Sequence, residues 1–522
     1  MINGCGYHST VKSKFSLLLL KPISCLARVA AVVPLLFLVD GLLSPAIAQT
    51  LPNLGDTERA ELSPQVERKL GEQIMRDIRR DRDFLDDAPT TEYLNNFGNS
   101  LLAVRPEARG EAGYDYFFFA VRDPMLNAFA LPGGFIGVHS ALMLAAQNES
   151  ELASVLAHEI GHVAQRHIAR MIGQQRQDSL IPLAAAVLAA LAARGSPDTS
   201  AALLMGGQGV ALQRQLNFSR DAEREADRIG LQILREAGFD TSGMIAFFGR
   251  MQTATRGYND TAPVYLRSHP LTTERIADIQ ARTRDQRYRQ RADSLDFHLV
   301  RARLRVLQDM SAQGLRDATT AFDTQMQQKT RPQLVSALYG KAFVALRQGA
   351  YTRAQTLLQE TLAAAQGPTA PVQSAVLTSL SIDIKLAANL AAEALKEADA
   401  ARQKFPLSRG IARQYADALI ASGRLDEAVT YLRDQAQLYR QEPKLHEQLA
   451  KAYAAQGKQA LQHLALAESY ALQGSVPTAI EQLGIARRSP DASFYDQAVI
   501  DAREREFKAR WMEELKEGQR DR

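Results

Sequence analysis

The spacing of apolar residues predicts a helix near the start of the folded chain. Between residues 60 and 110 apolar side chains recur at helical intervals, beginning with the stretch from Val66 to Ile74. Ser63 stands directly before Pro64, an order that is typical of an N-cap followed by proline in the first helical turn. We therefore expect an N-terminal helix that packs against the rest of its domain.

The pattern changes to short runs between residues 114 and 138. Aromatic residues crowd positions 114–121, and two short apolar runs flank Pro132-Gly133-Gly134. Short runs separated by proline and glycine are typical of strands joined by a tight turn. This stretch therefore predicts a small antiparallel sheet.

Helical spacing returns after the predicted sheet. Asn148 can cap a helix with Glu151 three positions later, and the apolar face continues to Val163. Two apolar segments follow, residues 180–193 and 201–212, and the first of them is shorter than the span of about 20 residues that a bilayer requires. They form either a flap over the active site, in peripheral contact with a membrane, or two ordinary buried helices.

The second half of the chain carries an internal repetition. From residue 334 the composition turns rich in Ala, Leu and Gln, and Ala416 and Gly423 recur 34 positions later as Ala450 and Gly457. In helical repeats small residues let paired helices approach, and stacking buries an apolar stripe that one unit cannot bury alone. We predict about four tetratricopeptide-like units, an arrangement whose usual use is to bind other proteins.

The first 48 residues have the order of a secretory signal peptide. A lysine-containing leader precedes an apolar run at residues 29–39, and the small-residue site Ala46-Ile47-Ala48 follows. We predict cleavage after Ala48, with an uncleaved anchor helix as the alternative. Because Cys5 and Cys25 both lie in the leader, the mature protein could form no disulfide.

Composition adds two limits to this picture. A hydrophobic content of 46% over 522 residues is sufficient for more than one core. The formal net charge of +4 falls to about +1 without the leader, and no long block of Lys and Arg is present. Nucleic acid is therefore not expected as a partner.

Candidate chemistry lies in the helix predicted after Asn148, in the run His158-Glu159-Ile160-Gly161-His162. Histidines four positions apart share a helix face and can present ring nitrogens to one metal ion. Glu159 would take a proton from the attacking water and pass it to the leaving amine. Gly161 costs about 1 kcal/mol in a helix relative to alanine, so we expect a closely packed partner behind the metal.

A third ligand must come from elsewhere, because a catalytic zinc ion takes three protein ligands and keeps one open position. His167 lies about 140° round the helix from His162, and we interpret it as a structural or surface histidine. In the run 219–227 Glu223 and Asp227 share a helix face, so one could bind zinc while the other supports a ligand histidine. Without the upstream motif, this run would be interpreted as a solvated helix face.

Four motifs in this order resemble the M48 peptidase family, and in particular its periplasmic branch. They are NAFALPGG at 127–134, HEIGHVAQRH at 158–167, SR-x-x-E-x-x-A-D at 219–227, and Ser268-His269-Pro270. The peptidase resemblance covers about residues 60–285 and continues through the repeats.

The resemblance implies a metal centre with one zinc ion per chain. His158, His162 and Glu223 would be the ligands and Asp227 their supporting carboxylate. His269 would lie near the metal, either as a removable fourth ligand or as a donor to the transition state.

The resemblance also implies a substrate and a cellular setting. A strand with Asn127, Ala128, Phe129 and Ala130 would pair with extended substrate. Unfolded or stalled outer-membrane β-barrel proteins would be the substrates, and the repeats would contact the β-barrel assembly machinery in the periplasm. A general periplasmic housekeeping peptidase and a non-proteolytic chaperone or scaffold are the alternatives.

The expected protein is mainly α, with a zincin-type α+β metallopeptidase domain followed by an all-α tetratricopeptide solenoid. Its expected parts are a signal peptide at 1–48, the peptidase at 49–290, a helical linker at 291–333, the repeats at 334–492 and a charged C-terminal helix at 493–522.

Overall fold

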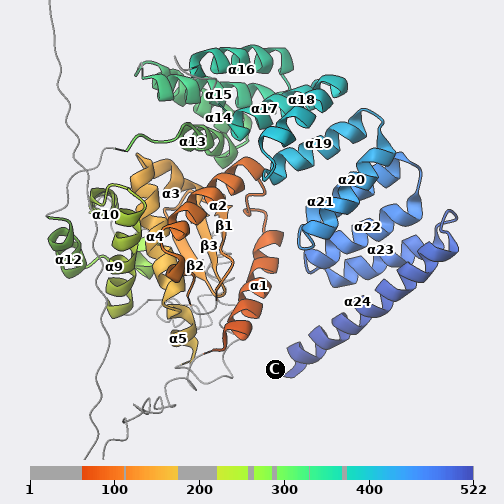
Figure 1. The fold of residues 1–522 in the computed structure, drawn as a ribbon, viewed down its shortest axis with the longest axis horizontal. Coiled ribbons are helices and arrows are strands. Elements are labelled where there is room, and N and C mark those ends of the chain that lie inside the picture. Colours follow the sequence, from red (N-terminus) through yellow and green to blue (C-terminus); the bar gives the residue numbers. More distant parts are fainter. Residues whose placement is uncertain are drawn as a thin grey trace, which may run out of the picture. The chain divides into compact units, whose positions relative to one another are not determined.

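The computed structural model describes residues 62–110, 113–173, 220–256, 264–284, 291–328, 330–366 and 373–520. Its first part combines helices with one small sheet (Figure 1). The elements of this part are α1 (Pro64–Arg80), α2 (Ala88–Ala103), the 3-10 turn η2 (Pro106–Arg109), β1 (Phe117–Val121), β2 (Ala128–Leu131), β3 (Phe135–His139), α3 (Ser140–Ala145), α4 (Glu149–Ala164), α5 (His167–Gly173), α9 (Arg220–Glu236), α10 (Ser242–Arg256), α11 (Val264–Ser268) and α12 (Thr273–Thr283).

Two predicted helix starts are confirmed. The Ser63 side chain accepts a hydrogen bond from the backbone N–H of Val66 at the start of α1, with Pro64 in the first turn. The Asn148 side chain caps α4 by accepting from the backbone N–H of Glu151. Local capping chemistry therefore sets where the motif-bearing helix begins.

The sheet is mixed, which corrects the expectation of an antiparallel one. β2 and β3 form the expected antiparallel pair around the proline–glycine turn, but β1 pairs with β3 in parallel, so that the strand order is β1-β3-β2. β3 is buried at all five positions and takes the central place. Successive strands still alternate in direction, and the parallel pair arises because β3, not β2, lies beside β1. Which strands become neighbours is a long-range choice that local sequence does not encode.

Helices cover both faces of the sheet. On one face Ile74 and Met75 of α1 pack against Phe119 and Phe135. On the other face the alternate strand residues join the main core, which includes α2 and α4. The period of two along the strands therefore divides their side chains between the two layers.

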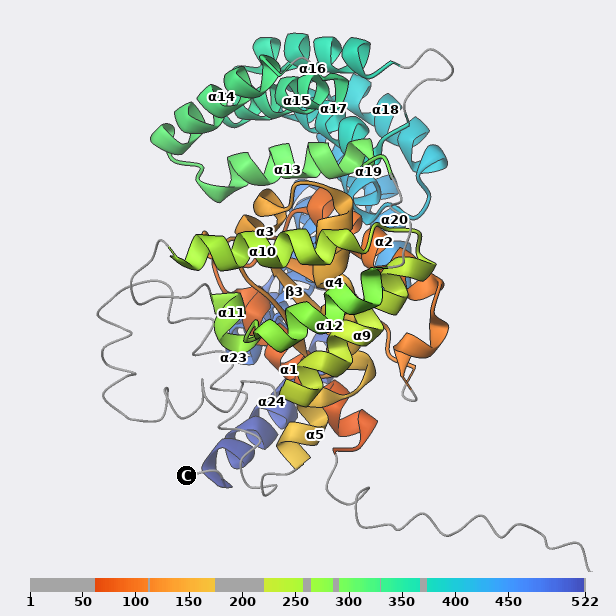
Figure 2. The same ribbon diagram turned by 90° about the vertical axis from the view of Figure 1, so that its left-hand side faces the viewer.

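α4 and α9 lie against each other at very short range (Figure 2). A Cβ built on Gly161 would lie 2.9 Å from both Cα and O of Ala226, and one built on Gly230 would lie 3.2 Å from the backbone N of His158. This confirms the expected partner behind the metal-binding motif. The glycines allow two helix backbones to approach more closely than alanine would permit.

The second part of the chain is built of successive helices (Figure 1). They are α13 (Leu295–Gln308), α14 (Ala312–Met326), α15 (Arg331–Arg347), α16 (Tyr351–Ala365), α17 (Ala375–Ala387), α18 (Ala391–Lys404), α19 (Arg409–Ala421), α20 (Leu425–Leu438), α21 (Pro443–Ala455), α22 (Gln459–Leu472), α23 (Val476–Arg488) and α24 (Phe494–Arg520).

The turns between these helices repeat every 34 residues over part of their length. Gly423 and Gly457 both end a helix at positive φ, and 34 positions before Gly423 the non-glycine residue Asn389 has a φ of 59°. The same backbone hydrogen bond closes the turns, from Leu390 N to Lys385 O and from Arg424 N to Leu419 O, each at 2.9 Å. Asparagine tolerates this conformation, which explains why the repeat pattern is hard to see around 385–404.

One hydrophobic core joins the sheet region to the first helices of the second part. The buried cluster that contains Leu156 of α4 continues through Val300 and Tyr339 to Leu380. At the same junction Arg303 Nε lies 2.8 and 2.9 Å from the two carboxylate oxygens of Asp87. The core therefore continues past residue 290, the boundary expected from the sequence.

Several sequence predictions lie outside the described residues. They include the signal peptide at 1–48 and the apolar segments 180–193 and 201–212. Within the described ranges, no helix is both long and apolar enough to cross a membrane.

Candidate metal centre

Six side chains that the sequence singled out meet in the interior. All six are at most 2% exposed. They are His158, Glu159 and His162 on α4, Glu223 and Asp227 on α9, and His269 directly after α11.

Four of these residues form a cage for a metal ion. His158 Nε2 lies 3.0 Å from His162 Nε2 and 3.4 Å from His269 Nδ1. Glu223 Oε1 lies 3.3 Å from His162 Nε2 and 2.9 Å from His269 Nδ1, and one ligand atom from each residue lies within 4.8 Å of all the others. Ligand atoms on a tetrahedral zinc ion with bonds of about 2.0–2.1 Å are about 3.3 Å apart, so the group fits such an ion.

A buried arginine holds the carboxylates of this cage. Arg275 of α12 bonds both oxygens of Asp227, at 2.7 and 2.8 Å, and its remaining terminal nitrogen lies 2.7 Å from Glu223 Oε2. Asp227 Oδ1 in turn lies 2.9 Å from His158 Nδ1. Sequence reasoning missed Arg275, since a single arginine on a helix carries no pattern that distinguishes a buried clamp from a surface charge.

The electrostatics of the cage favour a positive charge at its centre. Burial opposes a charge on His158, but hydrogen bonds with Asp227 and Glu223 raise its pKa to about 10. Burial also opposes charge on Glu223, yet His269 and the two α4 histidines hold its pKa well below the usual range. Two ionised carboxylates thus face the group of ring nitrogens, the donor set that suits a divalent cation.

Glu159 is completely buried and lies beside the cage. Its Oε1 lies 3.6 Å from His269 Nε2, and the backbone amide of Ala130 faces the same carboxylate. Burial raises the pKa of Glu159, while His269, His158 and the Ala130 backbone amide act in the opposite direction. With one backbone amide as its donor, this buried carboxylate keeps acceptor positions open for a reacting water.

Tyr265 is a second buried group that the sequence analysis missed. Its ring centroid lies 4.7 Å from that of His269 and 6.5 Å from that of His158. Its hydroxyl is buried without a hydrogen-bond partner in the described part of the chain. The sequence did hold a signal for Tyr265. This residue precedes His269 by about one helical turn, so the two side chains could share a face.

His167 is not a surface residue, which corrects one of the two interpretations left open for it. α4 ends at Ala164, and Arg166 has a positive φ of 51°, so that the chain turns before α5 begins at His167. The angle expected on a continuous helix therefore does not apply. Instead, His167 is 4% exposed, and its Nδ1 lies 2.8 Å from Nδ1 of His162.

The strand predicted to bind substrate is β2, at one edge of the sheet. The carbonyl of Asn127, which directly precedes β2, accepts a hydrogen bond from the His139 backbone N–H. Hydrogen-bonded positions alternate along an antiparallel pair. The backbone N–H and C=O of Phe129 therefore also point toward β3, whereas those of Ala128 and Ala130 point away from it. The outward side of the strand thus faces Glu159, which agrees with the lowering of the Glu159 pKa by the Ala130 backbone amide.

Comparison with known proteins places these features in a family. Residues 91–283 match peptidase family M48. The chain is 32% identical to the β-barrel assembly-enhancing protease of Escherichia coli K12 over 466 residues, covering 89% of this chain and 93% of that protein. It is 32% identical to the protein of the same name from Yersinia pestis, over 94% of this chain and 95% of that one.

Another relative matches a shorter stretch of the chain. The mitochondrial metalloendopeptidase OMA1 of Schizosaccharomyces pombe is 34% identical over 192 residues, which are 37% of this chain and 52% of that protein. The likeness to the bacterial proteases, by contrast, runs through the peptidase part and the helical repeats alike. The chain therefore belongs to peptidase family M48 and, within that family of metallopeptidases, to the β-barrel assembly-enhancing proteases.

Proposed function

We propose that this protein is a zinc-dependent endopeptidase of the periplasm that acts in the quality control of outer-membrane β-barrel proteins. The observation that carries the catalytic part of the proposal is the buried group of four ligand atoms beside Glu159. Zinc is the proposed ion because two imidazoles and one carboxylate form a common set for catalytic zinc and leave a fourth position for substrate or water.

In this proposal His158, His162 and Glu223 hold the ion, and His269 is near the fourth position. A bound zinc ion would polarise the scissile carbonyl and lower the pKa of water toward neutrality. Glu159 takes the proton from the attacking water and delivers it to the leaving nitrogen. Asp227 and Arg275 keep the His158 ring and the Glu223 carboxylate in place during this transfer.

The edge strand β2 would align the substrate. An extended polypeptide can add to the outward backbone groups of Ala128 and to the carbonyl of Ala130, whose amide faces Glu159. Main-chain hydrogen bonds of this kind are independent of the substrate's side chains. Such recognition suits unfolded or stalled β-barrel precursors, whose strands have not yet paired.

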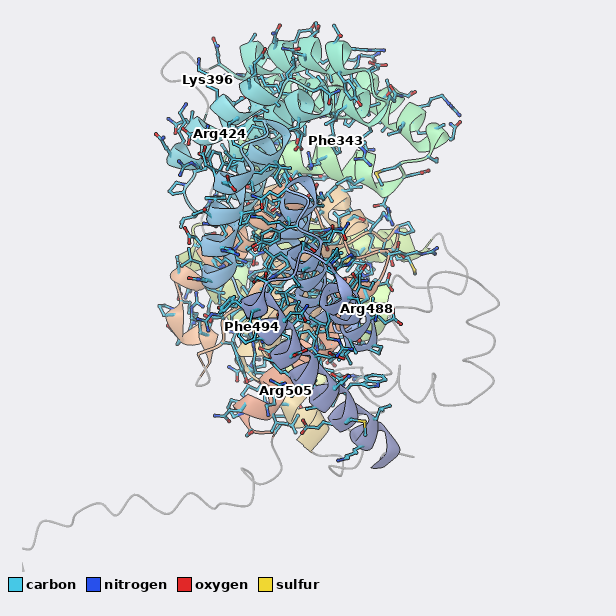
Figure 3. The ribbon with its side chains drawn as sticks, turned by 90° about the vertical axis from the view of Figure 1, so that its right-hand side faces the viewer. Phe343, Lys396, Arg424, Arg488, Phe494 and Arg505 are labelled. Carbon is cyan, nitrogen blue, oxygen red and sulfur yellow. The ribbon has the colours of Figure 1, made fainter. Side chains whose placement is uncertain are left out.

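The helical repeats would contact the assembly machinery. Their outer surface presents exposed charged groups, among them Lys396 and Arg424. The C-terminal helix α24, which follows the repeats, begins at Phe494, and this side chain is 92% exposed (Figure 3). The repeats would recruit clients, while the metal centre decides whether a stalled client is cleaved. The name of the bacterial relatives supports a role in β-barrel assembly, and the leader at 1–48 supports export.

The test of the catalytic proposal is Glu159→Gln. The variant should retain one zinc ion per chain and lose casein hydrolysis, because only the proton acceptor is altered. Glu427→Gln, on helix α20, is the matched control and should behave as the wild type. Full activity of Glu159→Gln would remove Glu159 from the reaction, and a zinc-loaded wild type that prevents aggregation but never cleaves would indicate a chaperone.

A further inference from the structure

The second ring nitrogen of His162 leads away from the metal centre through a chain of close contacts. His162 Nδ1 lies 2.8 Å from His167 Nδ1, and His167 Nε2 lies 3.1 Å from Glu225 Oε2. Arg170 contacts the same carboxylate oxygen at 3.2 Å. The two imidazoles are buried, whereas the Arg170 and Glu225 side chains are 39% and 41% exposed. The chain of contacts thus runs from the interior of α4 to a half-exposed ion pair between α5 and α9.

A metal ion on His162 would favour a particular arrangement of protons along these contacts. His162 presents Nε2 to Glu223 and His158, so a neutral ring that binds metal through Nε2 carries its proton on Nδ1. For that N–H to donate to His167 across the 2.8 Å contact, Nδ1 of His167 must be unprotonated. The proton of a neutral His167 is then on Nε2, from which it donates to the Glu225 carboxylate.

We propose that His167 is a positioning residue of the metal site, and that Glu225 acts through it to orient His162 and increase its basicity as a ligand. This inference rests on the proposed function in that it assigns His162 to the metal. A carboxylate that receives the outer N–H of a ligand histidine fixes the ring and strengthens the metal bond. Here one imidazole lies between the ligand and the carboxylate.

The other α4 ligand shows the same order of groups without the intervening ring. His158 contacts Asp227 directly, and Arg275 bonds that carboxylate. In both cases a ligand histidine is followed by a carboxylate and then an arginine. The difference is exposure, since Asp227 and Arg275 are each 2% exposed, so the His162 side is the one that surface substitutions can reach.

The test compares zinc affinities of full-length variants by competition with a chelator. His167→Phe removes both hydrogen bonds and should weaken zinc binding by about 10- to 100-fold. His167→Asn places an acceptor close to the position of Nδ1 and should recover part of that loss. Glu225→Gln, at a half-exposed position, should weaken binding in the same direction without disturbing the fold. His463→Phe, at a partly buried histidine that contacts Gln482 in the repeats, is the control and should bind zinc as the wild type does.

A spectroscopic measurement separates positioning from simple packing. In the zinc-loaded protein, nitrogen-15 spectra of labelled histidines should show His162 protonated on Nδ1 and His167 on Nε2. Glu225→Gln should shift the His162 Nδ1–H signal, and the KM for a peptide substrate should stay unchanged at saturating zinc. Protonation of His167 on Nδ1, or unchanged zinc affinity in both His167→Phe and Glu225→Gln, would overturn the proposal. A wild-type protein that binds no zinc would instead refute the proposed function itself.

Discussion

Replacing Gly161 by alanine sets helix propensity against packing at the metal centre. Alanine is favoured over glycine inside a helix by about 1 kcal/mol, so the change would stabilise an isolated α4. In the folded protein the new Cβ would lie 2.9 Å from Cα and O of Ala226, below the 3.4 Å at which ordinary contact begins. The two helices must therefore separate locally by about 0.5 Å.

This separation should affect the metal more than the fold. Overpacking costs about 1–3 kcal/mol, which leaves a net loss of about 0–2 kcal/mol after the gain in propensity. Ala226 lies between Glu223 and Asp227 on α9, however, and metal–ligand distances tolerate about 0.2 Å. We therefore expect Gly161→Ala to fold with nearly normal stability and to lose most of its zinc affinity and hydrolysis.

Three measurements test this expectation. Chemical unfolding in the presence of a chelator gives the stability of the fold without metal, zinc content reports metal binding, and casein cleavage reports hydrolysis. The matched control is Gly249→Ala in α10, because a Cβ there would meet nothing within 4 Å. This control should gain up to about 1 kcal/mol and keep its zinc. If Gly161→Ala were as stabilised as the control and bound zinc normally, the argument from helix contact would be refuted.

Three further changes test single groups. Tyr265→Phe removes a buried hydroxyl that has no hydrogen-bond partner among the described residues, so the variant should be more stable by about 1–3 kcal/mol. It should cleave about 100-fold more slowly if that hydroxyl contacts the reacting carbonyl, and unchanged turnover would exclude that contact. His269→Ala should raise basal casein cleavage, because His269 Nδ1 belongs to the ligand group, whereas loss of activity would identify it as a transition-state donor. Burial raises the pKa of Glu92 against hydrogen bonds from Gly410 and Ser408, so its contribution to stability is full below the unfolded pKa and declines as the pH rises through the folded value. Glu92→Gln should abolish this decline in unfolding midpoints measured from pH 4 to 8, and an identical pH profile would contradict it.

The sequence was most informative where short-range chemistry decides the structure. The Asn148 cap and the four-residue spacing of His158 and His162 depend on the geometry of one helix, and both could be derived directly. The contact behind Gly161 could be expected because a glycine inside a helix has a known cost. The spacing of Glu223 and Asp227 placed both on one face, and the structure brings that face to the histidines.

What the sequence could not give depends on contacts between distant segments. The parallel pairing of β1 with β3 follows from the central place of β3 in the sheet, which is a choice of neighbour between separate segments. His167 was judged by its angle on a helix that in fact ends three residues earlier, at Ala164. Arg275 resembles any other helical arginine until the fold places it against two buried carboxylates.

The unbroken core between α4 and α17 makes the loss of metal more than a loss of chemistry. An ion present at a thousand times its dissociation constant would stabilise the native state by about 4 kcal/mol, and a shared core distributes this stabilisation to every helix that unfolds with it. Amide hydrogen exchange in α13 to α17 should therefore quicken when the ion is removed, far from any ligand. A metal-free molecule would therefore open its first repeats together with its metal centre more often, and an added protease should cleave both parts faster than in the zinc-loaded protein.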